Sequence, residues 1–336
     1  MYSLFRPFLF KLEPETAHHL TLQLVRMAGA FPPARWVLQA LFFAPQKPVE
    51  VFGLKFKNPV GLAAGYDKDG IAIHGLAALG FGHLEIGTIT LRPQPGNPRP
   101  RVFRLIEDKA VINRMGFPGD GAKKCEQNLL SIAHRPSSAI LGVNLGKNKD
   151  TPLENAASDY ISLMRTFSPL ADYLAINISS PNTVGLRRLQ GREMLEGLLG
   201  AIAKERPACS VQRPILVKLA PDLTQEELED AIEVIFQSGM DGVIATNTTL
   251  ARDGLRSRQQ RETGGLSGGP LRVRSENILA QVIKIIDGRL PVVSVGGIMS
   301  PEDAIRRLDL GAALVQVYTG LVYAGPGLVR KIIRAV

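Results

Sequence analysis

Short apolar runs alternate with amphipathic stretches over most of the chain, from residue 53 onward. Small or turn-forming residues bound these runs, which is typical of buried β-strands; they cover residues 58–65, 83–90, 140–146, 173–179, 215–221, 242–248, 291–297 and 314–320. Stretches with helical spacing of apolar residues lie between them and include 70–80, 152–167, 191–205, 224–238, 271–287 and 301–309. Strands that alternate with helices pair in parallel through right-handed crossovers. Eight such units predict an α/β fold, a closed (β/α)8 TIM barrel, in preference to an open doubly wound sheet.

Residues 1–43 follow a helical pattern instead. A first apolar stripe precedes Pro14, which can begin a second helix that Gly29 closes, and a third stripe surrounds Trp36. This segment holds six of the thirteen phenylalanines and the only tryptophan. A short helical module rich in aromatic residues can lie in a membrane interface, and it can equally pack against the barrel. We expect a small N-terminal helical module over 1–43 and the barrel over 44–336.

Polar residues occur near the C-terminal ends of six predicted strands, where a barrel strand is otherwise apolar. Each one taken alone is typical of a helix cap or a satisfied turn residue. Together they share the end of the barrel where active sites lie. They are Lys68, Thr88, Asn144, Asn177, Lys218 and Asn247.

Lys218 has apolar neighbours on both sides in sequence, so its ammonium group needs an anionic partner. The partner is either a ligand with delocalised negative charge or a carboxylate on another strand, for example Glu85. The sequence leaves both possibilities open.

The last two strands end in glycine-containing turns, at Gly296-Gly297 and at Tyr318-Thr319-Gly320. Barrels often bind phosphate between these two loops through backbone N–H groups, which glycine lets approach closely. Residues 264–270 are expected to add further backbone donors. The stretch 91–139 is longer than a simple connection, and long insertions at this end of a barrel usually serve the site.

The charge of the chain is strongly basic, with a formal net charge of +9. Nucleic acid, an anionic membrane surface and small anionic ligands are the possible partners, and the absence of zinc-finger spacing, an RNP-like motif and a long Lys/Arg block argues against nucleic acid. The two cysteines, Cys125 and Cys209, cannot build a four-cysteine metal site, and no metal is expected. We expect a reduced compartment rather than a disulfide. No apolar run is long enough to cross a bilayer, and the N-terminus does not resemble a signal peptide.

Eleven motifs occur in an order that resembles the dihydroorotate dehydrogenase family, in its quinone-using, membrane-associated class (class 2). They span nearly the whole chain: AAGYDKDG (63–70), EIGTIT (85–90), RVFRL (101–105), VINRMGF (111–117), GVNLGKNKD (142–150), NISSPNT (177–183), VKLAPD (217–222), IATNTT (244–249), GGLSG (264–268), VGGI (295–298) and VYTG (317–320). The resemblance implies an FMN-containing barrel that oxidises (S)-dihydroorotate to orotate in de novo pyrimidine (UMP) biosynthesis. Ubiquinone or menaquinone would then reoxidise the flavin.

The resemblance also implies the catalytic residues. Ser180 would be the base that removes a ring proton, Thr183 with an ordered water would relay it, and Phe117 would exclude bulk water. Sequence spacing does not choose between Ser179 and Ser180; the family motif does. The soluble classes use a cysteine base and one adds an iron–sulfur subunit, so the serine and the few cysteines favour the quinone-using class.

Three sets of binding residues follow from the same resemblance. The set for the substrate is Lys68, Asn113, Arg114, Met115, Gly116, Phe117, Asn177, Asn182, Asn247 and Thr248. The set for FMN is Ala64, Gly65, Tyr66, Asp67, Lys68, Thr88, Asn144, Asn177, Lys218, Thr246, Gly268, Gly297, Tyr318 and Thr319. The set for quinone access is His18, Arg104 and Tyr318.

Two residues depart from the family pattern. Gly269 stands where relatives often carry a basic residue, and Tyr66 stands where they often carry another apolar or aromatic one. His18, taken alone, is more typical of a half-exposed helix residue than of a ligand contact. The alternatives to the implied activity are another FMN-dependent barrel oxidoreductase and a non-catalytic barrel that binds a phosphorylated ligand. We expect a monomer, bound peripherally through its N-terminal helices to the cytoplasmic face of the bacterial inner membrane.

Overall fold

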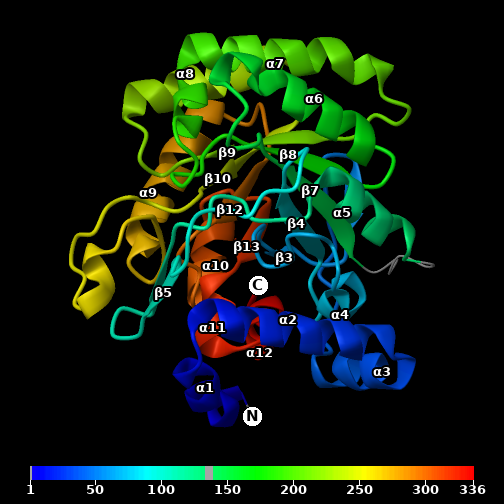
Figure 1. Cartoon of the computed structure of the whole chain (residues 1–336), viewed down its shortest axis with the longest axis vertical. Helices are drawn as coiled ribbons and strands as arrows, with labels where there is room; N and C mark the ends of the chain where they lie inside the picture. The colour runs from blue at the N-terminus through cyan, green and yellow to red at the C-terminus, as the bar shows by residue number, and fades with distance from the viewer. Residues whose placement is uncertain (1, 133–138) are drawn as a thin grey trace.

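The computed structural model describes residues 2–132 and 139–336, and eight parallel strands among them close into a barrel (Figure 1). The order around the barrel is β10-β12-β13-β3-β4-β7-β8-β9. Each strand falls within one predicted run, so the predicted (β/α)8 fold is confirmed. The strands are β3 (Val60–Leu62), β4 (His83–Ile89), β7 (Ile140–Leu145), β8 (Tyr173–Asn177), β9 (Ile215–Leu219), β10 (Gly242–Ala245), β12 (Val292–Val295) and β13 (Leu314–Val317).

The helices around the barrel begin and end close to the predicted bounds. Two of them start with a capping box, formed by Thr224 with Glu227 and by Ser300 with Asp303, in which side chains satisfy free backbone N–H groups. The predicted helices are α4 (Ile73–Ala78), α6 (Ala156–Phe167), α7 (Arg192–Glu205), α8 (Gln225–Gln237), α9 (Leu271–Ile286) and α10 (Pro301–Asp309). The structure adds α5 (Gly121–Leu130), α11 (Thr319–Ala324) and α12 (Gly327–Ala335), and the short 3₁₀ turns η1 (Leu153–Asn155), η2 (Leu186–Gln190), η3 (Arg206–Ala208) and η4 (Arg258–Arg261).

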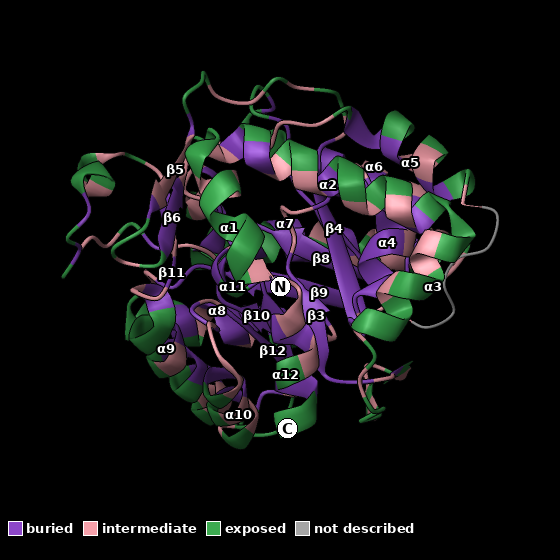
Figure 2. Cartoon of the chain, turned by 90° about the horizontal axis from the view of Figure 1, so that it is seen from below, coloured by how far each residue is buried: buried purple, intermediate pink, exposed green. Residues whose placement is uncertain are grey.

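The barrel strands are buried on both faces, as Figure 2 shows by their purple colour. The outer faces pack against the surrounding helices in one large apolar cluster, because parallel strands covered by helices exclude water on both sides. A small hairpin, β1 (Val49–Val51) with β2 (Leu54–Phe56), packs where the barrel strands begin. Its Phe56 meets the His83 ring edge to face at 5.4 Å.

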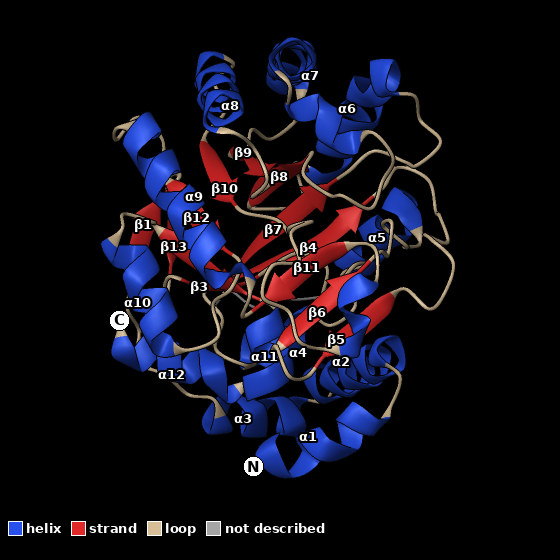
Figure 3. Cartoon of the chain, turned by 90° about the vertical axis from the view of Figure 1, so that its left-hand side faces the viewer, coloured by secondary structure: helices blue, strands red, loops and turns tan. Residues whose placement is uncertain are grey.

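The insertion at 91–139 forms most of a second sheet. Strands β5 (Val102–Leu105) and β6 (Ala110–Asn113) make a hairpin, and β11 (Gly265–Gly268) pairs antiparallel with β6. Figure 3 shows this sheet between the barrel and helices α1 (Tyr2–Lys11) and α2 (Pro14–Ala30). The segment 264–270, expected to add backbone donors, is mainly a strand, and residues 265–268 of it pair with β6. Residues 133–138 of the predicted insertion lie outside the described residues.

The N-terminal segment forms the three predicted helices, α1, α2 and α3 (Pro32–Leu41). Phe31 separates the last two in an extended conformation, which the following proline favours. Helix α2 packs closely on α4, since a Cβ on Gly75 would lie 2.0 Å from the Val25 carbonyl oxygen. A buried ion pair ties α2 to the insertion: Arg101 Nη2 lies 2.7 Å from Glu15 Oε1.

Large apolar side chains cover the outward surface of these three helices. No described helix is both long and apolar enough to span a bilayer. The exposed apolar residues include Leu4, Phe5, Phe8, Leu24, Met27, Phe31, Trp36 and Val37.

Both cysteines are free thiols, and burial raises the pKa of Cys125.

Candidate active site

One cavity of about 680 Å³ opens at the C-terminal ends of the barrel strands, a volume within the usual range for small-molecule sites. Its inner part is polar and is lined by strand-end residues. Its outer part is apolar and is lined by the N-terminal helices, with Phe5, Leu9, Leu24, Leu38 and Phe42 among the lining residues. The cavity therefore joins a polar chamber to an apolar entrance.

Four of the six predicted strand-end residues form one hydrogen-bonded chain. Thr88 Oγ1 donates to Asn144 Oδ1 (2.6 Å), and Asn177 Nδ2 donates to both Thr88 Oγ1 (2.9 Å) and Asn144 Oδ1 (3.1 Å). Asn247 Nδ2 donates to Asn177 Oδ1 (3.3 Å). The prediction that these side chains gather at one end of the barrel is confirmed. Asn144 lies behind Thr88 and Asn177 and does not itself line the cavity.

Lys218 lines the cavity and meets Glu85, with Nζ 3.4 Å from Oε1. Of the two partners considered from sequence, the structure has the carboxylate of another strand. Burial by itself raises the pKa of Glu85, but the Lys218 ammonium and hydrogen bonds from Gln316, Tyr173 and Asn144 bring the pKa below its ordinary value. The floor of the chamber is thus a buried ion pair whose carboxylate accepts four hydrogen bonds.

Lys68 is the second cation of the chamber. Its Nζ donates to the Gly65 carbonyl oxygen (2.9 Å), and no carboxylate lies within ion-pairing distance of it among residues 2–132 and 139–336. Burial lowers the pKa of Lys68 to about 8, although Asp69 and Glu15 act in the opposite direction. A ligand carboxylate would therefore supply a missing partner.

The two adjacent serines after β8 have different surroundings. Ser179 Oγ donates to Asn177 Oδ1 (3.1 Å) and accepts from Asn247 Nδ2 (2.9 Å), so it belongs to the amide chain. Ser180 lines the cavity, and its Oγ accepts one hydrogen bond within the described part of the chain, from Asn182 N (3.3 Å). Only Ser180 has a hydroxyl that can meet a ligand.

The glycine turns at the ends of β11 and β12 leave no room for side chains. Gly297 has φ +73°, and a Cβ there would lie 2.3 Å from Arg272 Cα. Helix α9 begins at this point without a side-chain cap; Arg272 N donates to Gly269 O (3.1 Å), and the other N–H groups of the first turn suit an anion. Arg307 is fully buried beside the turn and donates from Nη2 to Arg272 O (2.8 Å), Ser275 Oγ (2.9 Å) and Gly296 O (3.2 Å). Burial lowers its pKa to about 10, so it stays charged at neutral pH beside this turn.

A row of three aromatic rings, His18, Tyr66 and Tyr318, lines the cavity. His18 of α2 meets Tyr66 edge to face at 4.9 Å, and Tyr66 meets Tyr318 at 6.0 Å. Burial lowers the pKa of His18 to about 3, so the ring is neutral in this row. Arg104 donates to Phe10 O (3.0 Å) and lies over the Phe10 ring at the edge of the entrance.

Comparison with known proteins identifies the relatives of this chain. Residues 47–336 match the family described as dihydroorotate dehydrogenase. The chain belongs to the dihydroorotate dehydrogenase family. It is 48% identical over 334 residues to a protein from Roseiflexus sp. (strain RS-1), covering 99% of this chain and 92% of that one. It is also 48% identical to a protein from Halorhodospira halophila, covering 100% and 97%. Both relatives are named dihydroorotate dehydrogenase (quinone).

Solved structures of the family share the fold. A crystal structure of DHODH in complex with ferulenol from Eimeria tenella has a TM-score of 0.87 and 36% identity, over 98% of this chain and 93% of that one. The ligand-free form from the same organism has a TM-score of 0.82 and 38% identity, over 92% and 93%.

Most residues that the resemblance to the dihydroorotate dehydrogenase family implied do line this one cavity. Besides Lys68, Thr88, Asn177, Ser180, Lys218 and Asn247, they are His18, Ala64, Gly65, Tyr66, Arg104, Asn113, Met115, Gly116, Phe117, Asn182, Thr246, Thr248, Gly268, Gly297, Tyr318 and Thr319. Thr183 is buried nearby, and its Oγ1 has no hydrogen-bond partner within the described residues.

Two of the implied residues have side chains engaged elsewhere. Asp67 accepts from Ile71 N (3.0 Å) and Ala72 N (2.8 Å), so its carboxylate fixes the turn into α4. Arg114 pairs with Glu262 at 2.6 Å and stacks over a phenylalanine ring, away from the cavity. Only the backbone of either residue remains for a ligand.

The two departures from the family pattern have simple surroundings. The Tyr66 hydroxyl lies 3.5 Å from Thr21 Oγ1 of α2, so its partner is a helix residue. A Cβ on Gly269 would lie 3.1 Å from Asp108 O.

The sequence did not single out Arg187 or Arg307, which contact the site only through other residues. The one sequence signal for Arg307 is its spacing in α10: it lies three and four residues after Ala304 and Asp303, on the face of the helix that is buried.

Replacing Glu85 with Gln should destabilise the protein in a pH-dependent way. Removing one partner of a buried ion pair costs about 3–5 kcal/mol, so we expect a loss of this order in the free energy of unfolding at pH 7, measured by urea titration. Because the folded-state pKa of Glu85 is lowered, the contribution of its charge is present above the unfolded-state pKa and is lost as pH falls through the folded-state value. The difference from the wild type should therefore stay constant from pH 7 to about pH 5 and shrink only below the unfolded-state pKa of about 4.3. The matched control, Glu196→Gln in an exposed pair with Arg192, should change little at any pH; a pH-independent difference for Glu85→Gln would contradict the prediction.

Proposed function

We propose that this protein oxidises (S)-dihydroorotate to orotate, with FMN as hydride acceptor and a membrane quinone as final electron acceptor, in de novo pyrimidine biosynthesis. The observation that carries the proposal is the single cavity that joins a polar chamber, with Ser180 and Lys68, to an apolar entrance under the N-terminal helices. Such a cavity suits a small polar substrate at one end and an apolar electron acceptor at the other. The names of the relatives support the same activity.

The residues present fit FMN. The turn at Gly297 has a positive φ and no room for a side chain, so its backbone is exposed to the cavity, and beside it lie a helix start without a side-chain cap and the buried cation Arg307, which suit a phosphate. Thr88 and Lys218 lie at the chamber floor, where they can meet the ring system. When bound, FMN supplies the hydride acceptor for the reaction. The Lys218 ammonium would stabilise negative charge that develops on the ring.

The substrate would be held by charge and by amide groups. Lys68 would pair with the carboxylate. Asn113, Asn177, Asn182 and Asn247 offer both donors and acceptors, which match a ring that carries N–H groups and carbonyl oxygens. Asn182 Nδ2 already donates to Asn113 Oδ1 (3.1 Å), so part of this set is ordered without a ligand.

Ser180 would accept the ring proton at its Oγ while its own hydroxyl proton passes to Thr183. The Asn182 N–H, which this oxygen already accepts, would stabilise the negative charge that develops on Oγ as the hydroxyl proton leaves. Thr183, with its unpartnered buried hydroxyl, would pass the proton outward with an ordered water. Phe117 lies against Gly146 in a left-handed conformation (φ +53°), which is costly for a bulky residue and occurs mainly at functional sites. It would exclude bulk water from the chamber.

The N-terminal module, residues 1–43, would bind the membrane surface and admit the quinone to the barrel domain, residues 44–336. The outward apolar side chains of α1–α3 suit a peripheral contact with lipid, and the basic net charge suits an anionic surface. His18, Arg104 and Tyr318 would line the route to the flavin. We propose a monomer on the cytoplasmic face of a bacterial inner membrane.

The proposal is tested most directly by the colour of the purified protein. We expect a yellow protein whose flavin absorbance is bleached by dihydroorotate under anaerobic conditions and restored by ubiquinone or menaquinone. A yellow protein that only another substrate bleaches would indicate a different FMN-dependent oxidoreductase. A colourless protein that cannot be loaded with FMN would favour a non-catalytic barrel.

Replacing Ser180 with Ala should slow flavin bleaching by about 10²-fold or more, because a general base contributes about 10²–10⁴-fold. FMN content and orotate binding, followed by the flavin spectrum, should persist. Ser179→Ala should cause a smaller loss, through its contact with Asn247, and Ser158→Ala on the exposed surface should cause none. Bleaching of Ser180→Ala at the wild-type rate would refute the assignment of the base.

The KM for dihydroorotate should rise as pH increases past about 8. Burial lowers the pKa of free Lys68 to about this value, so above it the ammonium that attracts the substrate carboxylate is lost. Bound substrate favours the charged form, so the pKa of Lys68 in the complex should be higher than in the free enzyme. Stopped-flow bleaching from pH 6 to pH 10 measures both values. Lys68→Met should have a high KM without this pH dependence; a wild-type KM that is constant across the range would contradict the role.

A further inference from the structure

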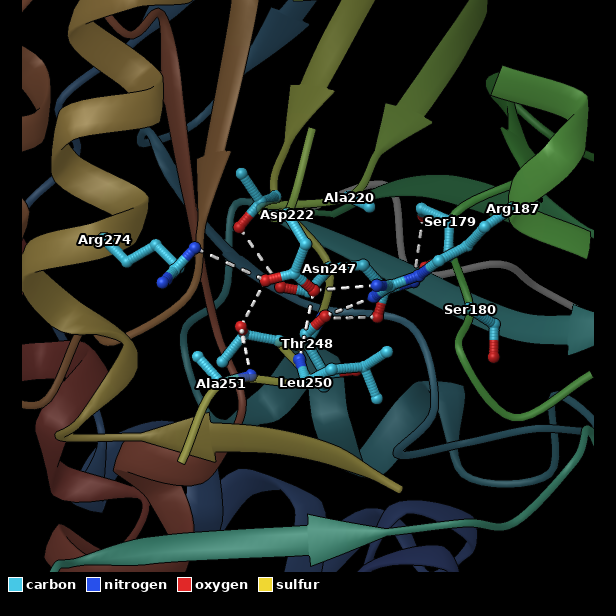
Figure 4. Close-up of polar contacts among 12 residues, drawn as sticks. Ser179, Ser180, Arg187, Ala220, Asp222, Asn247, Thr248, Leu250, Ala251 and Arg274 are labelled. Carbon is cyan, nitrogen blue, oxygen red and sulfur yellow. Dashed lines mark hydrogen bonds and ion pairs between the residues drawn. The ribbon is translucent and has the colours of Figure 1, made fainter. Parts of the chain in front are cut away.

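The guanidinium group of Arg187 contacts three different strand-end loops (Figure 4). Its Nε donates to Ser179 O (2.9 Å) in the loop after β8, and its Nη2 donates to Thr248 O (2.7 Å) in the loop after β10. Its Nη1 donates to Asp222 Oδ2 (2.7 Å) in the loop after β9. Arg187 itself lies in the short turn η2, so one side chain joins three consecutive loops at the top of the barrel.

Asp222 completes this arrangement from the middle loop. Its Oδ1 accepts from the Thr249 hydroxyl, and its Oδ2 accepts from Leu250 N (3.0 Å). Arg274 Nη1 lies 3.6 Å from Oδ1 and adds a second positive neighbour. The carboxylate therefore neutralises Arg187 while it fixes the loop after β10 from the other side.

The two carbonyl oxygens that Arg187 holds are adjacent in sequence to the groups that would touch the substrate. Ser179 precedes Ser180, and Thr248 follows Asn247. In Figure 4 the Ser180 side chain lies outside the dashed contacts, while Asn247 lies among them. Within the described residues the Ser180 Oγ accepts one hydrogen bond, from Asn182 N (3.3 Å). The position of the Ser180 hydroxyl therefore depends mainly on the backbone that Arg187 fixes.

We propose that Arg187, with Asp222, is a positioning residue for proton removal: it sets the distance between the Ser180 hydroxyl and the substrate that Asn247 holds. The inference rests on the proposed function and goes beyond it, because neither side chain lines the cavity. Arginine is required, since its planar fork reaches three acceptors in fixed directions. Lysine is a point charge on a flexible stem and cannot reproduce them.

The test is Arg187→Lys in the full-length, FMN-loaded protein. A misplacement of about 1 Å can cost about 10²-fold in rate, so we expect the bleaching rate at saturating dihydroorotate to fall by about 10- to 100-fold. The KM and the rate of reoxidation by quinone should change by less than about threefold. Substrate deuterated at the carbon that loses the proton should give a larger isotope effect in the variant, because proton removal has become more rate-limiting. A purely structural role would lower the melting temperature without changing the isotope effect.

The matched control is Arg192→Lys. Arg192 follows five residues later and also pairs with an aspartate of the next unit, Asp230, but it contacts no strand-end carbonyl and is exposed. It should behave as the wild type. Asp222→Asn is a second variant, for use if Arg187→Lys does not accumulate, and it should also bleach slowly. The double variant Arg187→Lys/Asp222→Asn should bleach no more slowly than the slower of the two single variants, because both changes remove the same interaction.

Two results would overturn the inference. One is bleaching of Arg187→Lys within about twofold of the wild-type and Arg192→Lys rates. The other is an equal loss in bleaching and in quinone reoxidation, which would indicate general damage. Failure of dihydroorotate to bleach the wild type would instead reject the proposed function, so the two failures are distinguishable.

Discussion

The burial of one carboxylate, Glu85, at the floor of the barrel is the constraint on which the site depends. An unpaired charge there would cost far more than any single apolar contact returns. Each of its oxygens therefore receives two donors: Oε1 from Asn144 and Lys218, and Oε2 from Tyr173 and Gln316. These four partners come from β7, β9, β8 and β13, so the charge links five strands of the barrel. The same pairing holds the Lys218 ammonium at the cavity wall, and the electrostatic character of the chamber is thus set by the packing of the barrel itself.

A chain of side-chain hydrogen bonds connects this carboxylate to the residues of the chamber. Asn144 connects Glu85 to Thr88 and Asn177, and Asn177 connects to Asn247 and Ser179. Each amide of this chain both donates and accepts hydrogen bonds, which fixes its rotamer. Other cavity-lining groups have fewer partners: the Lys68 ammonium has one carbonyl partner, the Ser180 hydroxyl accepts one N–H, and Thr248 Oγ1 has no partner within the described residues. These groups, rather than the bonded amides, are available to a ligand.

The sequence predicts local features well and long-range pairing poorly. The eight strands and six of the outer helices follow from apolar periodicity, because each depends on neighbours within a few residues. The sheet of β5, β6 and β11 does not, since Gly265 pairs with Asn113 across about 150 residues and a glycine-rich segment has no strand pattern. The sequence could not decide between a ligand and Glu85 as the partner of Lys218, because the two residues are far apart in the chain and meet only in the folded barrel. Likewise the motif selects Ser180 over Ser179, but only the contacts of Ser179 with Asn177 and Asn247 explain why the earlier hydroxyl is not available.

The cavity is polar at its inner end and apolar at its entrance, so the two ends suit different kinds of ligand. At the inner end burial leaves Lys68 with a pKa near 8, low enough to respond to a ligand and high enough to stay charged at neutral pH. Within the aromatic row, burial lowers the pKa of His18 to about 3, so this ring is uncharged at neutral pH. An apolar molecule gains nothing by passing the row, because the asparagines beyond would lose water without new partners. Under the proposed function, this desolvation cost would keep an apolar electron acceptor on the entrance side of the row and leave the chamber to the polar substrate.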